Sequence, residues 1–452
     1  MMDWIHSHIP AWVWIAIVAH LVVLLTVAYL ILLERKVAAW VQDRVGPNRV
    51  GLGFGIVPIL KNWRMAGLGQ PMADGLKFLL KEDFRPKGAD AALFTIAPAI
   101  MMIVAIVSIA VIPWGGVKQT AVPAGTHIPP GVTVVVSDAQ SVTYRYPFQI
   151  ANLNIGVLYV VAVLSLGVYG VVVGGWASNN KFSFLGALRA TANMISYEIP
   201  LGLSILCIVL MYGTLDLATI VQRQTHLWLG VVPAWNVFTQ PLAFVLFLVC
   251  IHAEANRAPF DLAEAEQELV GGYHTEYSSM RFAFFFLAEY AGMITTSLVC
   301  VALFFGGWHI PYLTDGRVDP TDATVTSSLA LCVARGAVFY LKAMAVIVVF
   351  MWVRWSLPRF RFDQLMHIAW RGLIPISLAL AAGTALAVYW LGGTTVEVVG
   401  FRAGVVLVAM NLIVLIGTFT AARVLPSAPD TNRRIHVPGS RFSGTPLEAD
   451  AN

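Results

Sequence analysis

The sequence predicts an all-α, polytopic membrane protein, and three observations support this fold class. Of its 452 residues, 58% are hydrophobic and only 12% are charged, whereas soluble domains carry roughly 25% charged residues. Apolar runs long enough to cross a bilayer recur along the chain. Lysine and arginine gather in alternate connecting segments, as in chains that cross a membrane repeatedly. A soluble domain is therefore excluded, and nothing indicates nucleic-acid binding.

Nine apolar runs are interpreted as transmembrane helices. The first is followed by Glu34-Arg35-Lys36, the reverse of the charge order in a secretory signal, so we expect a retained helix. The fifth is short and is expected to extend a few residues at either end. In order, the runs are Ala11–Leu33, Ala91–Ile112, Ile155–Gly175, Ile195–Tyr212, Pro241–Ala253, Phe282–Phe305, Gly336–Val353, Leu373–Leu391 and Val405–Val424.

The placement of basic residues predicts how the chain lies in the membrane. Ten of the 29 lysines and arginines fall in the first loop, residues 34–90. Because loops rich in Lys and Arg stay in the cytoplasm, we expect the N-terminus outside. The loop 254–281 and the C-terminus are then cytoplasmic.

Two segments are candidates for amphipathic helices at the membrane interface. In Pro71–Lys81 an apolar stripe lies opposite charged residues, although an ordinary charged loop helix fits this pattern equally well. Asp74 and Lys77 are spaced for an ion pair along that helix. The second candidate is Lys181–Ala192, just before the fourth span. The stripe consists of Met72, Leu76, Leu79 and Leu80, and faces Asp74, Lys77 and Lys81.

The segments outside the spans divide the chain further. The β-branched run in the outer loop Pro113–Pro147 predicts a small hairpin, and Asp315–Thr326 is a second polar outer loop. The tail 425–452, rich in Pro, Ser and Gly, is predicted to be disordered and cytoplasmic. We therefore divide the chain into a main transmembrane domain, residues 1–392, an additional C-terminal helix within 393–424, and this tail.

The four cysteines do not form a metal-binding or disulfide pattern. No CxxC pair or Cys/His cluster is present, and three of the cysteines lie inside apolar runs while the fourth lies just before one. They are interpreted as small buried hydrophobic side chains. They are Cys207, Cys250, Cys300 and Cys332.

The segment 254–289 holds seven of the chain's 25 acidic residues. One carboxylate at the centre of a bilayer costs roughly 2.5–3.5 kcal/mol. These acids must therefore lie at the interface or face a polar cavity in which they act. They are Glu254, Asp261, Glu264, Glu266, Glu268, Glu276 and Glu289.

Pro259 predicts a break in the helix that enters this segment. A new helix then begins at Asp261, where Asp261 and Glu264 have the spacing of a capping box. Capping is an alternative role for these two acids. It leaves the remaining acids of the segment unexplained.

Three acids at the other spans have two interpretations each. Glu34, beside Arg35, ends the first span as an interfacial residue or as an acid at the mouth of a cavity. Glu198, two residues before Pro200, is an interfacial anchor or part of a polar path. Glu289 has apolar flanks, and Lys342 and Arg335 of the seventh span are possible partners.

The sequence contains no catalytic triad, phosphate-binding loop or flavin motif. Its chemistry consists of acids in apolar surroundings. Such groups can bind and release protons near neutral pH, so a change of charge nearby can be relayed along them.

Three motifs resemble one family. The segment EANRAPFDLAEAEQELVGGYHTEYSSMRFAFFFLAEY is similar to the signature loop of the H-type family of membrane quinone-site subunits of respiratory complex I, the proton-pumping NADH:quinone oxidoreductase. ERKVAAWVQDRVGPNRVG at Glu34–Gly51 and QPMADGLKFLLKED at Gln70–Asp83 match the same family in the same order. The resemblance covers about residues 10–392. The ninth helix, the tail and the enlarged loop 113–147 depart from the family's eight-helix pattern.

The resemblance implies a protein of the bacterial plasma membrane that lines the quinone chamber and begins a proton or charge relay. The chamber residues it implies are Arg35, Arg44, Asp74, Lys77, Arg257 and Phe260. The relay residues it implies are Glu34, Glu198, Glu254, Asp261, Glu264, Glu266, Glu268 and Glu289.

The resemblance also implies the substrate and the partners. Quinone, either ubiquinone or menaquinone, is the substrate, and this chain binds no cofactor by itself. FMN and iron–sulfur clusters belong to partner chains, which include peripheral quinone-site and iron–sulfur subunits, small membrane subunits and antiporter-like subunits. Two alternatives stay open: the homologous subunit of a membrane-bound hydrogenase, and a stand-alone proton-coupled transporter. A transporter is expected to show internal repeats, and the sequence has none that is convincing.

Overall fold

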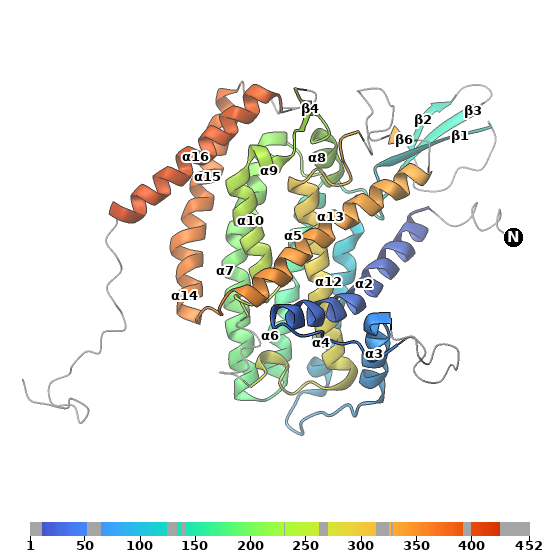
Figure 1. Ribbon diagram of the computed structural model, residues 1–452, viewed down its shortest axis with the longest axis vertical. Helices are drawn as coiled ribbons and strands as arrows, with labels where there is room; N and C mark the ends of the chain where they lie inside the picture. Colours follow the sequence, from blue (N-terminus) through green and yellow to red (C-terminus); the bar gives the residue numbers. More distant parts are fainter. Residues whose placement is uncertain are drawn as a thin grey trace, which may run out of the picture.

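The computed structural model describes residues 11–51, 65–123, 133–137, 141–229, 231–261, 270–312, 325–326, 329–391 and 399–424. Three upright helices form the centre of the bundle: α7 (Lys181–Tyr212), α10 (Pro241–Glu254) and α12 (Ser279–Phe304). Figure 1 shows α2 (Ala11–Val41) and α13 (Leu329–Ser356) crossing this centre at a slant. Helix α12 is the most buried of the long apolar helices, so its side chains meet neighbours on all sides.

The described residues contain eight helices that are long and apolar enough to cross a membrane, and a ninth, α10, of 14 residues. At 1.5 Å per residue α10 spans about 21 Å, less than the roughly 30 Å hydrocarbon core. The expected extension adds only Glu254, because Gln240 separates α10 from the four-residue α9 (Asn236–Thr239). The all-α membrane fold is confirmed. The other helices are α3 (Gln70–Leu80), α4 (Ala91–Val107), α5 (Gly156–Ser165), α6 (Gly167–Ala177), α8 (Leu217–Arg223), α14 (Phe362–His367), α15 (Ile374–Trp390) and α16 (Phe401–Val424), with short 3₁₀ or π segments at Met65–Gly67, Ser108–Val111, Gly272–His274 and Ile368–Leu373.

The third span is divided into two helices. Helix α5 ends at Ser165 and α6 begins at Gly167, with Leu166 between them. The break places the end of α5 inside the bundle, where Ser165 contacts Glu198 of α7. A polar pair therefore forms at the residue next to the break.

Helix α7 is continuous over 32 residues. The interfacial candidate Lys181–Ala192 is therefore helical, but it forms the first part of α7 and is continuous with the fourth span. The side chain of Asn180 caps the start of α7 by accepting a hydrogen bond from the backbone N–H of Phe182 at 2.9 Å, and Pro200 is accommodated inside the helix. With a length of about 48 Å, α7 extends beyond the bilayer.

The amphipathic helix predicted over Pro71–Lys81 is present as α3. None of its residues is buried, and Met72, Leu76 and Leu80 are largely exposed. The apolar stripe is therefore available to lipid or to a partner. The expected Asp74–Lys77 pair is wrong, because Asp74 pairs with Arg35 of α2 instead, at 3.0 Å.

The predicted outer hairpin is confirmed as part of a small sheet. Strands β1 (Val117–Pro123) and β3 (Ser141–Pro147) pair antiparallel, with Val117 opposite Pro147. The strand order is β2-β3-β1-β6, where β2 is Thr133–Ser137 and β6 is Val325–Thr326. Figure 1 places this sheet at the opposite end of the bundle from α3. A second, two-stranded sheet joins Leu227–Trp228 to Val232–Pro233.

Lys342 of α13 holds the C-terminal end of α12. Its ammonium group donates to the carbonyls of Phe305, Gly307 and His309 at 2.7, 3.0 and 2.7 Å. A cation at a helix C-terminus also compensates the negative end of the helix dipole. The expected pairing of Lys342 with Glu289 is therefore wrong, because the lysine is engaged beyond the C-terminal end of α12.

The additional C-terminal helix is confirmed as α16, and one buried amide pair attaches it to the bundle. Asn411 donates to the side chain of Gln240 at 2.9 Å and accepts from the backbone N–H of Leu242 at 3.2 Å. Both contacts lie at the start of α10. The predicted disordered tail, 425–452, lies outside the described residues.

Candidate functional site

A buried charge cluster surrounds Glu34 on α2. Glu34 is only 6% exposed, and it accepts hydrogen bonds from Tyr290 of α12 and Arg354 of α13. Arg257 lies 3.8 Å away and its guanidinium group packs 4.1 Å from the centre of the Tyr290 ring. The cluster contains two permanent cations and one acid, because arginine does not lose its proton in proteins.

Arg257 reaches this cluster because α10 ends at Glu254. The chain then turns at Asn256, whose φ is +48°, a conformation that asparagine tolerates better than most residues. The predicted break in this segment is confirmed. The carbonyl of Ala258 accepts a hydrogen bond from His252 Nε2 at 2.9 Å, which holds the turn against α10.

Phe260, predicted to line the quinone chamber, packs inside the bundle rather than at an opening. Its ring meets those of Tyr197 and His252 at centroid distances of 5.4 and 5.8 Å. Asn193 of α7 donates to the carbonyls of Ala253 and Phe260, each at 3.4 Å. Phe260 therefore fixes the position of the turn.

Asp261 ends the described part of this segment and is paired with a cation. It is 3% exposed and lies 3.0 Å from a guanidinium nitrogen of Arg359. The backbone N–H of Phe360 donates to the carbonyl of Pro259 at 3.1 Å. The segment after α13 therefore holds the Pro259–Asp261 turn by both charge and backbone. The capping box, Glu264, Glu266 and Glu268 lie outside the described residues.

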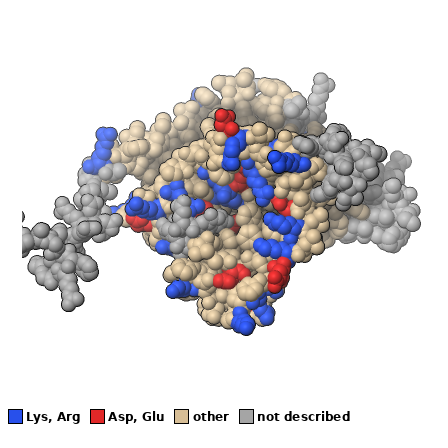
Figure 2. Space-filling view, turned by 60° about the horizontal axis from the view of Figure 1, so that its bottom comes forward, with Lys and Arg blue, Asp and Glu red and all other residues tan. Residues whose placement is uncertain are grey.

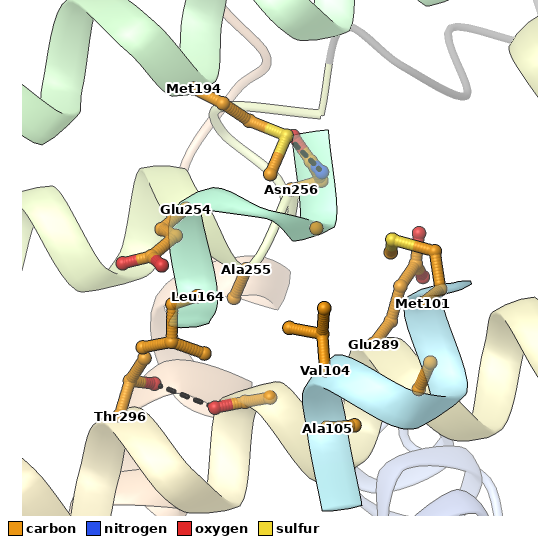
Figure 3. Close-up of a pocket in the computed structure, with 13 residues that line it drawn as sticks. Met101, Val104, Ala105, Leu164, Met194, Glu254, Ala255, Asn256, Glu289 and Thr296 are labelled. Atoms are coloured by element: carbon orange, nitrogen blue, oxygen red, sulfur yellow. Dashed lines mark hydrogen bonds between the residues drawn. The ribbon is translucent and has the colours of Figure 1, made fainter. Parts of the chain in front are cut away.

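Two further acids line one cavity between α4, α5, α6, α7, α10 and α12 (Figure 3). Glu254 and Glu289 enter it from α10 and α12, in a space of about 520 Å³ that includes its opening. The rest of the lining is mainly apolar and consists of Met101, Val104, Ala105, Leu164, Gly167, Met194, Ala255, Asn256, Ala288, Gly292 and Thr296.

The cavity acids have different partners from Glu34. Glu289 accepts a hydrogen bond from the hydroxyl of Tyr273 at 2.7 Å. Within the part of the chain that the structure describes, Glu254 makes neither a hydrogen bond nor an ion pair, although the charge of Glu198 acts on it. Glu198 in turn accepts a hydrogen bond from Ser165. Glu254 and Glu289 therefore share one cavity, while Glu198 is bonded to Ser165 of the neighbouring helix α5.

A second polar group lies at the surface where α2 meets α3. The carboxylate of Asp74 accepts hydrogen bonds from the guanidinium group of Arg35 at 3.0 Å and from the side-chain amide of Gln70 at 3.1 Å. Lys77 lies 5.0 Å from the centre of the Phe78 ring, and Arg44 donates to Gln42 on the exposed end of α2. Arg35, Asp74 and Lys77 are thus brought close together, while Arg257 and Phe260 belong to the buried turn.

Four partners of these acids were not predicted as site residues. Arg354 and Arg359 follow the seventh apolar run, where basic residues are expected for topology alone. Tyr273 and Tyr290 stand beside predicted acids but have no sequence pattern of their own. The only signal for either tyrosine is its place in the signature segment, which contains both.

The described residues contain no group of three or more His, Cys, Asp or Glu side chains placed to hold a metal ion. The four cysteines are buried and free. The chemistry available in the described site is therefore that of carboxyl, hydroxyl, amide and guanidinium groups, which move or stabilise charge.

Comparisons with known proteins agree with these motifs. A family model described as NADH dehydrogenase matches residues 14–385. The chain is 46% identical to an H-type subunit of the NADH-quinone oxidoreductase of Cytophaga hutchinsonii over 345 residues, 76% of this chain and 87% of the relative. It is 43% identical to the corresponding H-type protein of Leptospira biflexa over 395 residues, 87% of this chain and 98% of the relative. The H-type protein of Salinibacter ruber is 40% identical over 387 residues, 85% of this chain and 99% of the relative.

Proposed function

The chain belongs to the H-type subunit family of NADH-quinone oxidoreductase, and we propose that it forms part of the quinone chamber and the start of the charge relay that couples quinone reduction to proton pumping. It is a multi-pass membrane subunit of this enzyme complex.

One observation carries the relay proposal: the acids within the bundle fall into two groups. Glu34 and Asp261 are paired with arginines. Glu254 and Glu289 line a cavity, where Glu289 is bonded to a tyrosine hydroxyl and Glu254, among the described residues, has no cation beside it. An acid held by a permanent cation stays charged, whereas an acid held by neutral groups in apolar surroundings can exchange its proton.

The two groups meet at adjacent residues, which gives a route for coupling. On α12, Glu289 lines the cavity and the next residue, Tyr290, bonds Glu34. Beyond α10, Asn256 lines the cavity and the next residue, Arg257, approaches Glu34. A change of charge near Glu34 therefore acts on two elements that also bear cavity residues.

We place the quinone entrance where α2 meets α3. An amphiphile that enters from the bilayer needs apolar walls and a few polar groups. The exposed stripe of α3 supplies apolar surface, and Arg35, Asp74 and Lys77 supply the polar groups. Either ubiquinone or menaquinone fits this description, and the quinone that co-purifies with the complex identifies which is used.

Arg35→Lys tests the quinone entrance. Arg35 offers a planar fork of donors that lysine lacks, so we expect the quinone-dependent rate to fall about tenfold. NADH oxidation with a soluble artificial acceptor should be retained. Both rates are measured on the purified complex. A normal quinone-dependent rate and a normal apparent quinone affinity would mean that Arg35 serves only as a positive anchor at the membrane.

We propose that the partners are peripheral quinone-site and iron–sulfur subunits, small membrane subunits and antiporter-like subunits, and that FMN and the clusters reside in those chains. Purification in mild detergent tests this. Co-migration with quinone-reducing iron–sulfur subunits is expected. A nickel-containing partner would indicate the hydrogenase alternative instead, and solitary migration would indicate the transporter.

We propose that the membrane is the bacterial plasma membrane, with the N-terminus outside and the C-terminus in the cytoplasm. Lysine and arginine gather, with acids among them, on the face at the α3 end of the bundle (Figure 2), as expected for a cytoplasmic surface. The outer sheet lies at the other end.

A labelling experiment tests this orientation. The native cysteines are all buried, so the background reaction with an impermeant thiol reagent is low. A cysteine in place of Thr126 should react on intact cells, and one in place of Ser440 should react only after lysis. The opposite pattern would reverse the orientation.

A further inference from the structure

The two cavity acids are separated by a gap that they do not bridge themselves. In Figure 3 the carboxyl groups of Glu254 and Glu289 lie on opposite sides of the cavity, with Val104 and Leu164 between them. Within the described residues, no hydrogen bond joins the two acids. A proton cannot cross apolar side chains without intervening polar groups, so direct transfer between these carboxyls is excluded in this arrangement.

Asn256 supplies an unsatisfied polar atom at the same cavity. It is 6% exposed, and among the described residues its Oδ1 has no hydrogen-bond partner. Its Nδ2 reaches only the sulfur of Met194, at 3.8 Å (Figure 3), and thioether sulfur is a weak acceptor. Leaving a buried acceptor unpaired costs about 1–3 kcal/mol, and a bound water is the usual way in which such a group is satisfied.

The cavity meets the requirements for holding water. A buried water needs two to four polar partners and roughly 10–15 Å³ of space for its centre. Glu254, Glu289 and Asn256 provide three such partners, and the centres of water molecules can occupy about 60 Å³ of the cavity. Thr296 adds little, because its hydroxyl donates to the carbonyls of Gly292 and Met293 at 3.1 and 3.2 Å.

We propose that Asn256 holds a short file of water molecules that connects Glu254 to Glu289. Asn256 is then a positioning residue of the relay: it transfers no proton itself and orients the water that does. The inference rests on the relay proposed above. It also accounts for an asparagine at this turn, since the residue must accept a φ of +48° and present an amide to the cavity.

Two substitutions separate this role from a purely structural one. Asn256→Gly adopts the same φ without strain and removes the amide that orders the water, so its quinone-dependent rate should fall at least threefold and its solvent deuterium isotope effect should rise. Asn256→Leu fills the space with apolar atoms, and its rate should fall at least fivefold. Its solvent deuterium isotope effect should rise, because proton transfer becomes the slow step. NADH oxidation with a soluble acceptor reports assembly in both.

A normal rate in Asn256→Gly or Asn256→Leu would overturn the proposal, as would a loss in both variants without a rise in the isotope effect, which would make the amide structural. If the leucine variant does not assemble, Leu164→Phe closes the cavity from α5 and should give the same loss and isotope effect. Different outcomes would reject the relay and the water file. Normal pumping in Glu254→Gln and Glu289→Gln rejects the relay, whereas loss in those variants with normal Asn256→Leu rejects only the water file.

Discussion

Glu34→Gln is expected to destabilise the complex and to remove most of its quinone-dependent activity. The substitution keeps the shape of the side chain but removes the negative charge that Arg257 and Arg354 both face. Both arginines are largely buried, and breaking a buried ion pair by removing one partner costs about 3–5 kcal/mol. The melting temperature of the purified complex and the NADH:quinone rate measure the two effects.

A double variant that keeps the net charge of the cluster separates two causes of lost activity: the unbalanced charge of the buried arginines, and the loss of the charge of Glu34 itself. Glu34→Gln combined with Arg354→Gln removes one charge of each sign, so the melting temperature should recover by more than half. Recovery of stability without recovery of quinone reduction would mean that the charge of Glu34 also serves the reaction. A single variant that melts at the parental temperature would contradict the buried pairing.

Glu254→Gln is expected to lower quinone-coupled proton pumping by at least tenfold while the complex assembles normally. Glutamine occupies nearly the same volume in the cavity and removes the exchangeable acid. No cation pairs with Glu254 in the described residues, so neutralising it leaves no charge uncompensated and stability should be unchanged. Acidification by inside-out vesicles supplied with NADH measures pumping.

Glu276→Gln is the matched control for Glu254→Gln. Glu276 lies in the same part of the chain, but it is bonded to Asn180 at 2.6 Å and does not line the cavity. Its substitution should leave pumping within about twofold of normal. Equal losses in the two variants would indicate a general sensitivity of this segment to charge, and normal pumping in both would remove Glu254 from the relay.

Most of the fold was predictable because burial in a bilayer imposes one requirement on every span. Each apolar run had to satisfy its backbone as a helix, so all nine runs, including Pro241–Ala253, coincide with helices of the structure. The boundaries were less predictable. Lys181–Ala192 is fused with the fourth span and packs against the distant segment Gly272–His274, where Ser183 donates to the carbonyl of Tyr273 at 2.6 Å. The break at Leu166 is marked by neither a proline nor a charged residue.

The acids of the site were predictable individually, because a carboxyl group in an apolar segment is costly wherever it lies. Their pairings were not, since they join segments far apart in the chain. Glu34 meets Arg354, 320 residues later, and Asp261 meets Arg359. Each arginine had a sufficient explanation as a topological anchor. The distinction between cation-paired acids and cavity acids therefore required the three-dimensional arrangement.

The contacts of Lys342 also could not be predicted from the sequence. A lone lysine inside an apolar span invites pairing with a buried acid such as Glu289. Three backbone carbonyls past the end of α12 satisfy it instead. Free carbonyls at a helix C-terminus have no sequence signature beyond the helix end itself, so this partner could not be read from residue types.

The central claim, that the cavity acids exchange protons during turnover while Glu34 stays charged, is tested most directly by infrared difference spectroscopy of the complex as its quinone is reduced. We predict a carboxylic-acid C=O band that shifts in D₂O, is lost or weakened in Glu254→Gln and in Glu289→Gln, and is retained in Glu276→Gln. A band that is unchanged in both cavity variants would contradict the assignment of these acids to the relay.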